Sequence, residues 1–178
     1  MRLAKKQSIV AMSLCSVMLS GASAGAQVSE NVARHGVHVF ASNCFSPFMT
    51  GAKAAAIFDA DALRYDFYDL DPFSSAAPSP VTGRAATQGT DRRCEIAFDG
   101  DFRQQAATAT INALKAEGIL TKADLPSTHT EIEGTQLLAA RHLNPKRIAV
   151  VHVGLRPGPN GDETFLLVER LVPANDQN

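Results

Sequence analysis

The sequence predicts an α+β fold of two layers, with an antiparallel sheet of about four strands and helices packed mainly on one face. Two observations support this prediction. The last third of the chain contains three β-type runs separated by turn-forming residues, which is typical of an antiparallel meander. Ahead of them, the residues after Asp101 repeat apolar side chains at helical spacing, so one helix can cover the sheet.

The N-terminal residues have the pattern of a cleavable export signal. A basic head at Lys5 and Lys6 precedes an apolar run over residues 9–19, and small residues fill positions 24–26. This order is typical of a secretory signal peptide, and the apolar run is too short to cross a bilayer of about 30 Å. We therefore expect residues 1–26 to be removed and the protein to be periplasmic or secreted.

Residues 27–178 are expected to form a single domain, because about 150 residues suffice for one core. Signal cleavage lowers the number of basic residues from 17 to 14 against 18 acidic ones, a formal charge of −4. This balance lacks the basic stripe that binding to nucleic acid requires. No membrane span is expected after cleavage, since the apolar run over 148–155 is interrupted by His152 and Gly154.

Cysteine usage predicts one disulfide. Cys15 leaves with the signal, so Cys44 and Cys94 remain as an even pair in an oxidising compartment. Closing a loop of about 50 residues is worth ~4 kcal/mol in the chain-entropy treatment. The alternative, a free nucleophilic thiol, would need a general base and protection from oxidation.

The first half of the mature chain predicts two helices among irregular segments. Residues 27–34 are polar and expected to be loose, and apolar spacing over 37–44 predicts a short helix that delivers Cys44 to the core. Ser46 and Pro47 form a suitable opening for a second helix that continues to Phe58. Residues 61–80 fit either a helical turn or a strand, followed by a loop that extends to residue 93.

The middle of the chain predicts a strand followed by a helix. Residues 94–98 have strand composition and end at a turn-forming Asp-Gly pair. Asp101 is expected to cap the next helix, with Gln104 in the capping-box position and Gly118 ending it about four turns later.

The C-terminal third predicts the meander. The three β-type runs cover residues 136–143, 148–155 and 164–172. Their connections, 144–147 and 156–163, are rich in proline, glycine and asparagine. Short connections of this composition favour antiparallel neighbours.

One group of side chains in the meander resembles a catalytic site. If Leu143 pairs with Ile148 across the turn at 144–147, Arg141 lies opposite Val150, and if Leu155 pairs with Thr164, His152 lies opposite Leu167. In that register Arg141, His152 and Glu169 project from one side of the sheet and His142 from the other. A base, an acid and a cation on one face can perform acid–base chemistry. The structural alternative is a solvated charge pair worth under about 1 kcal/mol. A shift of one residue would also invert the grouping.

The sequence contains only incomplete metal-binding motifs and no cofactor-binding motif. His35 and His38 form an H-x-x-H pair, but no further zinc ligands follow at suitable spacing. Five aspartates lie between residues 59 and 71, yet Pro72 interrupts the pattern that a calcium loop needs. There is no nucleophile elbow, phosphate loop or dinucleotide fingerprint. We therefore expect no metal and no cofactor.

The sequence is compatible with two functions. The first is a small exported binding or interaction domain, without catalysis, whose partner is an unknown protein or small molecule. The second is a small secreted hydrolase that uses His152 with a carboxylate such as Glu169. The lack of a recognised catalytic spacing favours the first.

Overall fold

The computed structural model describes residues 24–58, 63–73 and 77–171, which form three helices and five strands. The helices are α1 (Ala24–Asn43), α2 (Gly51–Phe58) and α3 (Arg103–Ala116). The strands are β1 (Arg64–Asp69), β2 (Thr90–Asp99), β3 (Thr135–Asn144), β4 (Arg147–Gly158) and β5 (Gly161–Leu171).

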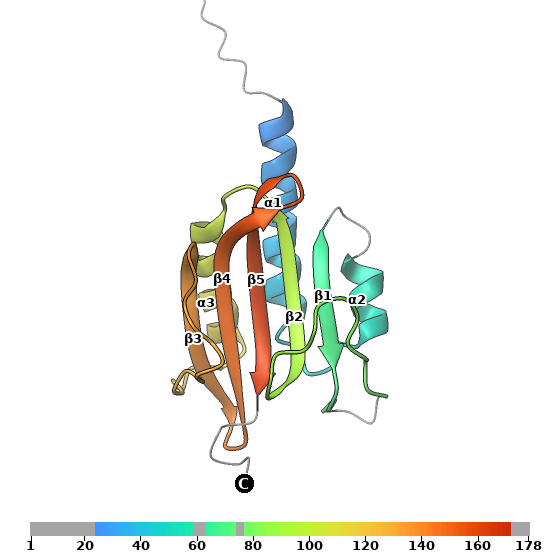
Figure 1. The fold of residues 1–178 in the computed structure, drawn as a ribbon, viewed down its shortest axis with the longest axis vertical. Coiled ribbons are helices and arrows are strands. Elements are labelled where there is room, and N and C mark those ends of the chain that lie inside the picture. Colours follow the sequence, from blue (N-terminus) through green and yellow to red (C-terminus); the bar gives the residue numbers. More distant parts are fainter. Residues whose placement is uncertain (1–23, 59–62, 74–76, 172–178) are drawn as a thin grey trace, which may run out of the picture.

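The strands form one antiparallel sheet in the order β1-β2-β5-β4-β3 (Figure 1). The predicted α+β class is confirmed, and the described sheet has five strands rather than about four. The additional strand is β1, in the segment that sequence patterning left between a helical turn and a strand. It pairs with β2 at the edge of the sheet.

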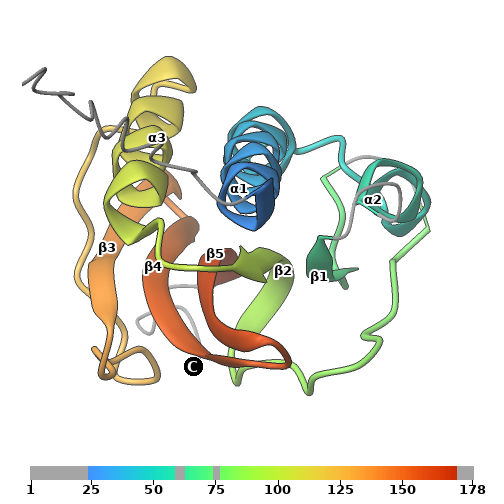
Figure 2. The same ribbon diagram turned by 90° about the horizontal axis from the view of Figure 1, so that it is seen from above.

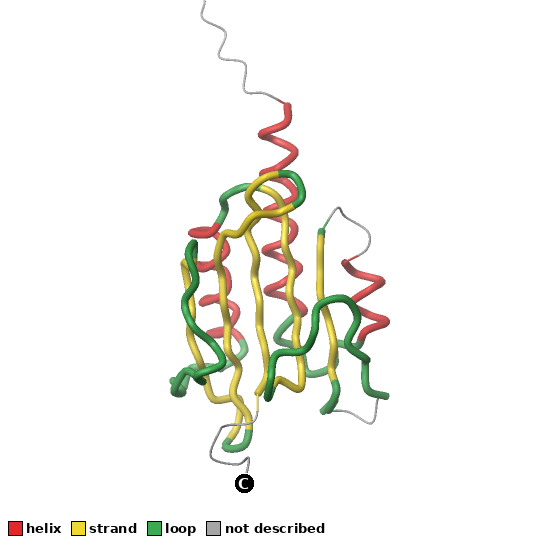
Figure 3. The backbone as a smooth tube through the Cα atoms, in the orientation of Figure 1, coloured by secondary structure: helices red, strands yellow, loops and turns green. Residues whose placement is uncertain are grey.

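The helices lie on one face of the sheet, as predicted (Figure 2). The main core forms between α1, α3 and the side chains of β2, β4 and β5 that point toward them. Gly36 allows α1 to approach β2 closely, because a Cβ atom at this position would lie 2.7 Å from the Phe98 ring. Two long connections, residues 77–89 and 117–134, reach the opposite face through Thr87 and His129, which contact Glu169. Both connections are drawn among the loops of Figure 3.

The predicted disulfide is present. Cys44 follows α1 and is bonded to Cys94 of β2, with the two Cα atoms 5.5 Å apart. Both residues are buried in the main core. The bond therefore fastens the end of the first helix to a central part of the sheet.

Two helix starts differ from the predictions. α1 begins at Ala24, so the segment 27–34 is helical rather than loose. α2 begins at Gly51 instead of Ser46, and the Thr50 hydroxyl oxygen accepts a 3.3 Å hydrogen bond from the Lys53 N–H. This bond is the interaction expected of a helix N-cap.

The start of α3 also differs. Its N-cap is Phe102, with no side-chain cap, whereas Asp101 binds the side chain of Arg103. The Phe102 N–H donates instead to the Thr164 hydroxyl at 2.8 Å, so β5 satisfies this end of the helix. The predicted end of α3 is correct, because Gly118 adopts φ +70°.

The predicted C-terminal meander is confirmed, with longer strands than expected. β4 continues to Gly158 and β5 begins at Gly161, so most of the predicted loop 156–163 is paired. The predicted signal, 1–26, lies almost entirely outside the described residues. Among the helices in the described part of the chain, none combines the length and apolar character needed to cross a bilayer.

Candidate functional site

A cavity of about 750 Å³ lies on the helix side, at the end of the sheet where β5 finishes. Four segments that are distant in the sequence form its walls: residues 45–47, 71–73, 117–119 and 143–147. We call it the hairpin cavity, because the hairpin between β3 and β4 forms one wall. Its volume is within the range of small-molecule sites, about 300–1,000 Å³.

Local turn chemistry positions two of these walls. After α3, the left-handed Gly118 reverses the chain, and the Ile119 N–H donates to the Leu114 carbonyl at 2.8 Å. This places the Ile119 side chain in the cavity wall. In the hairpin, the Asn144 side-chain oxygen accepts a 2.8 Å bond from the Lys146 N–H and fixes the turn.

The cavity surface is mainly apolar. Phe45, Ile119 and Leu143 line its inner part, and Phe73, with 75% of its surface exposed, lies at the opening. Phe73 also makes an edge contact with the exposed Phe48, with ring centroids 6.5 Å apart. Exposed aromatic side chains beside a cavity are common where a ligand or partner binds.

Two arginines of the wall are held by three aspartates. Arg170 donates to Asp91 at 2.7 Å and to Asp69 at 2.9 Å. Arg147 donates to the other Asp91 oxygen at 3.0 Å and to Asp71 at 2.8 Å. The two guanidinium groups are therefore fixed by carboxylates of the protein itself.

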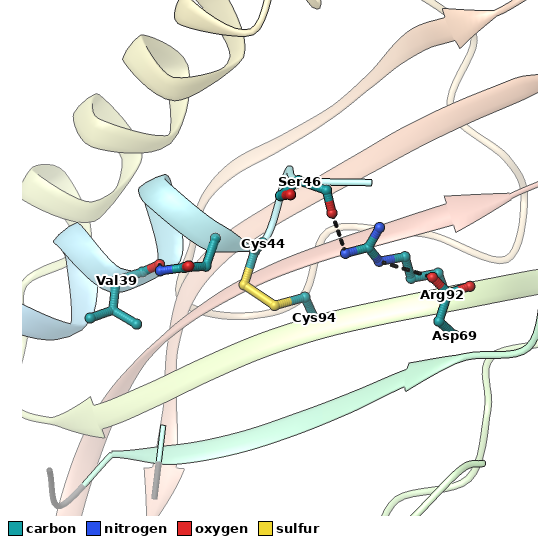
Figure 4. Close-up of a disulfide and its surroundings, with 7 residues drawn as sticks. Val39, Cys44, Ser46, Asp69, Arg92 and Cys94 are labelled. Carbon is teal, nitrogen blue, oxygen red and sulfur yellow. Dashed lines mark hydrogen bonds and ion pairs between the residues drawn. A yellow bond between two sulfur atoms is a disulfide. The ribbon is translucent and has the colours of Figure 1, made fainter. Parts of the chain in front are cut away.

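Arg92 is the most buried cation of the wall, with 6% of its surface exposed. Its Nη2 donates to the Ser46 carbonyl at 2.6 Å, and its Nε lies 3.7 Å from Asp69 Oδ2 (Figure 4). That separation is too long for a hydrogen bond, and Nε has no hydrogen-bond partner among the described residues. Burial lowers the pKa of Arg92 to about 10, so it remains charged at neutral pH.

A smaller chamber of about 40 Å³ continues inward from the hairpin cavity. Arg92 and Arg170 line both spaces, together with Phe45, Ile119 and Leu143. Cys44 lines only the chamber, so the disulfide forms part of its inner wall.

The other face of the sheet carries a buried charge network around Glu169. One carboxylate oxygen accepts hydrogen bonds from Arg93 Nε and the Thr87 hydroxyl, each at 2.8 Å. The second lies 2.8 Å from His129 Nε2. Burial raises the pKa of Glu169, but the bonds from His129 and Thr87 and the charge of Arg93 outweigh it, so the pKa is lowered overall.

His152 lies near this network but does not bind Glu169 directly. Its Nε2 is 2.8 Å from the Thr135 hydroxyl, and its ring packs against Phe165 with centroids 5.0 Å apart. The predicted register between β4 and β5 is correct, with His152 opposite Leu167. Burial, with a smaller contribution from His129, lowers the pKa of His152 and favours its neutral form.

Arg141 does not join His152 and Glu169, so the predicted grouping is wrong on this point. The sequence-based register placed Arg141 opposite Val150, whereas the structure pairs it with Ala149. A register shift between His142 and Asn144 moves the strand by one residue. Side chains alternate between faces, so Arg141 lies on the other face from His152.

The described residues contain no group of three or more side chains suited to hold a metal ion. His35 and His38 lie one helical turn apart on α1, and both are exposed. Of the aspartates between 59 and 71, Asp69 and Asp71 bind arginines of the hairpin cavity.

Sequence reasoning missed both the hairpin cavity and the Glu169 network. The pair Arg92-Arg93 beside Cys94 was one available signal, because adjacent strand residues project to opposite faces and the pair therefore places one arginine on each face of the sheet. Arg92 accordingly enters the cavity and Arg93 the network. The loop histidine, His129, gave no comparable signal.

Comparison with known proteins identifies no relative: no family model matches the sequence, and neither the curated proteins nor the solved structures contain a significant match.

Proposed function

We propose that this protein is a small exported binding protein, without catalysis, that holds a small and largely apolar ligand in the hairpin cavity. The observation that carries the proposal is the cavity itself, about 750 Å³ in volume with aromatic and aliphatic walls. Six charged side chains line it as well, and polar groups among apolar walls are typical of sites that bind and orient small molecules.

Export to the periplasm or the extracellular medium is part of the proposal. The Cys44–Cys94 disulfide supports it, because such bonds persist in oxidising compartments and are rare in the cytosol. The signal-like pattern of residues 1–26 supports it as well. Intact-mass analysis of protein recovered from the native host should show a chain that begins near Gln27, with two hydrogens lost to the disulfide. Full-length, reduced protein in the cytosol would contradict export.

The hydrolase alternative is less well supported by the geometry. Both Glu169 oxygens are engaged by Arg93, Thr87 and His129, and the His152 Nε2 is engaged by Thr135. Neither group is arranged to activate the other. We therefore expect a His152→Ala variant to keep its ligand binding.

The test uses the neutral fluorescent probe N-phenyl-1-naphthylamine, which brightens in apolar surroundings. Saturable binding with one site per chain is expected for the wild-type protein. The variant Ile119→Trp should lose this binding, because the larger side chain fills the inner part of the cavity.

Ile111→Trp is the matched control. Ile111 is an exposed α3 residue outside the cavity, so the same substitution should leave probe binding unchanged. Thermal unfolding of both variants would establish that they are folded. Equal binding by wild-type protein and folded Ile119→Trp, or no binding at all, would overturn the proposed function.

A further inference from the structure

Arg92 is a buried cation whose hydrogen-bonding capacity is largely unused. A guanidinium group carries five N–H donors. The described residues give Arg92 one hydrogen bond, from Nη2 to the Ser46 carbonyl oxygen. Asp69 approaches its Nε only to 3.7 Å, and neither that nitrogen nor Asp69 Oδ2 has a hydrogen-bond partner among the described residues. A buried charge in this condition is costly unless another group pairs with it.

The neighbouring carboxylates make their hydrogen bonds to other arginines, and the Asp69 oxygen that makes none lies 3.7 Å from Arg92. Asp69, Asp71 and Asp91 all accept hydrogen bonds from Arg147 or Arg170. Arg92 therefore lines the cavity without a hydrogen-bonded carboxylate partner among the described residues. Asp69 forms an ion pair with Arg92 at 3.7 Å and the Phe67 ring lies 5.5 Å from its Cζ, but neither accepts a conventional hydrogen bond from it. A ligand carboxylate would supply those hydrogen bonds.

We propose that the ligand is an amphipathic monocarboxylate, whose carboxylate pairs with Arg92 while its apolar body lies along Phe45, Ile119 and Leu143. This inference rests on the proposed function, because it names the class of ligand for the same cavity. The planar fork of a guanidinium matches a carboxylate with two parallel hydrogen bonds.

The wall carries four cations, Arg92, Lys146, Arg147 and Arg170, and two acids, Asp71 and Glu117. Aspartates already bind Arg147 and Arg170, and a phosphate dianion would also meet the like charges of the two acids, so the wall suits one negative charge better than two. The inner chamber beside Arg92, about 40 Å³, has room for roughly a few water-sized groups, which suits a carboxylate. The larger outer space then holds the apolar body.

The experiment compares three molecules with the same chain length and different head groups. Decanoate, 1-decanol and decylamine compete for the wild-type protein against N-phenyl-1-naphthylamine at pH 8, below their aggregation concentrations. We expect decanoate to displace the probe at a concentration at least about tenfold lower than decanol, the gain typical of a hydrogen bond to a charged group. Decylamine should be the weakest competitor, because it brings a second cation to Arg92.

Substitution of Arg92 provides the second arm. In Arg92→Gln the advantage of decanoate over decanol should fall to within about twofold, with both competitors measured against that variant's own affinity for the probe. Arg103→Gln is the control, because Arg103 pairs with Asp101 at the start of α3, outside the hairpin cavity. It should keep the full advantage of decanoate.

The outcomes separate the two proposals. Probe binding that decanoate and decanol displace equally in the wild-type protein would overturn the carboxylate inference and leave the binding function standing. Preferred binding of decylamine would overturn it too. Failure of the wild-type protein to bind the probe or any competitor would overturn the proposed function itself. The wild-type comparison decides the question even if Arg92→Gln does not fold.

Discussion

Replacement of Glu169 by glutamine should destabilise the protein by about 3 kcal/mol. Removing one partner of a buried ion pair leaves an uncompensated charge, at a typical cost of about 3–5 kcal/mol. Glu169 is 2% exposed, and so is its partner Arg93. The lower end of the range applies here, because Arg93 also donates a 2.9 Å hydrogen bond to Asp66, and the substitution leaves that partner in place. Urea denaturation followed by circular dichroism measures the change in the free energy of unfolding.

Glu163→Gln is the matched control on the same strand and the same face. Glu163 is also buried, but its partners Arg64 and Arg156 have side chains 34% and 31% exposed, so water can solvate them when the carboxylate is lost. We expect a loss of about 1 kcal/mol for this variant. Equal losses for the two variants, or a Glu169→Gln protein as stable as the wild type, would refute the argument from burial.

Three further predictions concern stability. Glu169 has a lower pKa in the folded protein than its unfolded value of 4.5, so its contribution to stability is complete above pH 4.5 and is lost as the pH falls through the folded pKa. The free energy of unfolding should therefore fall more steeply with acid in the wild-type protein than in Glu169→Gln. Parallel curves would contradict this. Reduction of the Cys44–Cys94 bond should lower the free energy of unfolding by about 4 kcal/mol, because the bond joins residues separated by 50 positions. Urea titrations with and without reductant measure the change, and an unchanged midpoint would refute the prediction. Gly36→Ala should lower the free energy of unfolding by about 1–3 kcal/mol, seen as a lower melting temperature, because the added methyl group overlaps the Phe98 ring. A melting temperature equal to that of the wild type would contradict this and show that α1 shifts freely.

The fold class could be predicted from the sequence because its signals are local. The three C-terminal runs alternate or repeat apolar residues between turn-forming segments, and within this meander β4 lies beside both β3 and β5. The pair Cys44 and Cys94 was predictable as well, since two cysteines allow one pairing. α1 was underestimated because residues 27–34 are mostly polar. Ala33 lies four residues before Val37 and is buried in the main core, but one small side chain is a weak apolar signal.

The site could not be predicted, because it depends on contacts between distant segments. The hairpin cavity requires residues near 45, 72, 119 and 145 to meet, and no local pattern encodes that meeting. The error at Arg141 came from a different cause. The register shift between His142 and Asn144 places Arg141 on the other face of the sheet, and the turn sequence did not reveal it.

Nuclear magnetic resonance of the arginine Nε–H groups shows where the ligand binds. Decanoate is titrated into isotope-labelled wild-type protein while the signals of Arg92 and Arg103 are followed. The Arg92 Nε–H signal should shift strongly and saturate with one ligand per chain, together with the methyl signal of Ile119, while Arg103 stays unchanged. An unmoved Arg92 signal, with changes confined to the His129 and Glu169 side of the sheet, would contradict the account.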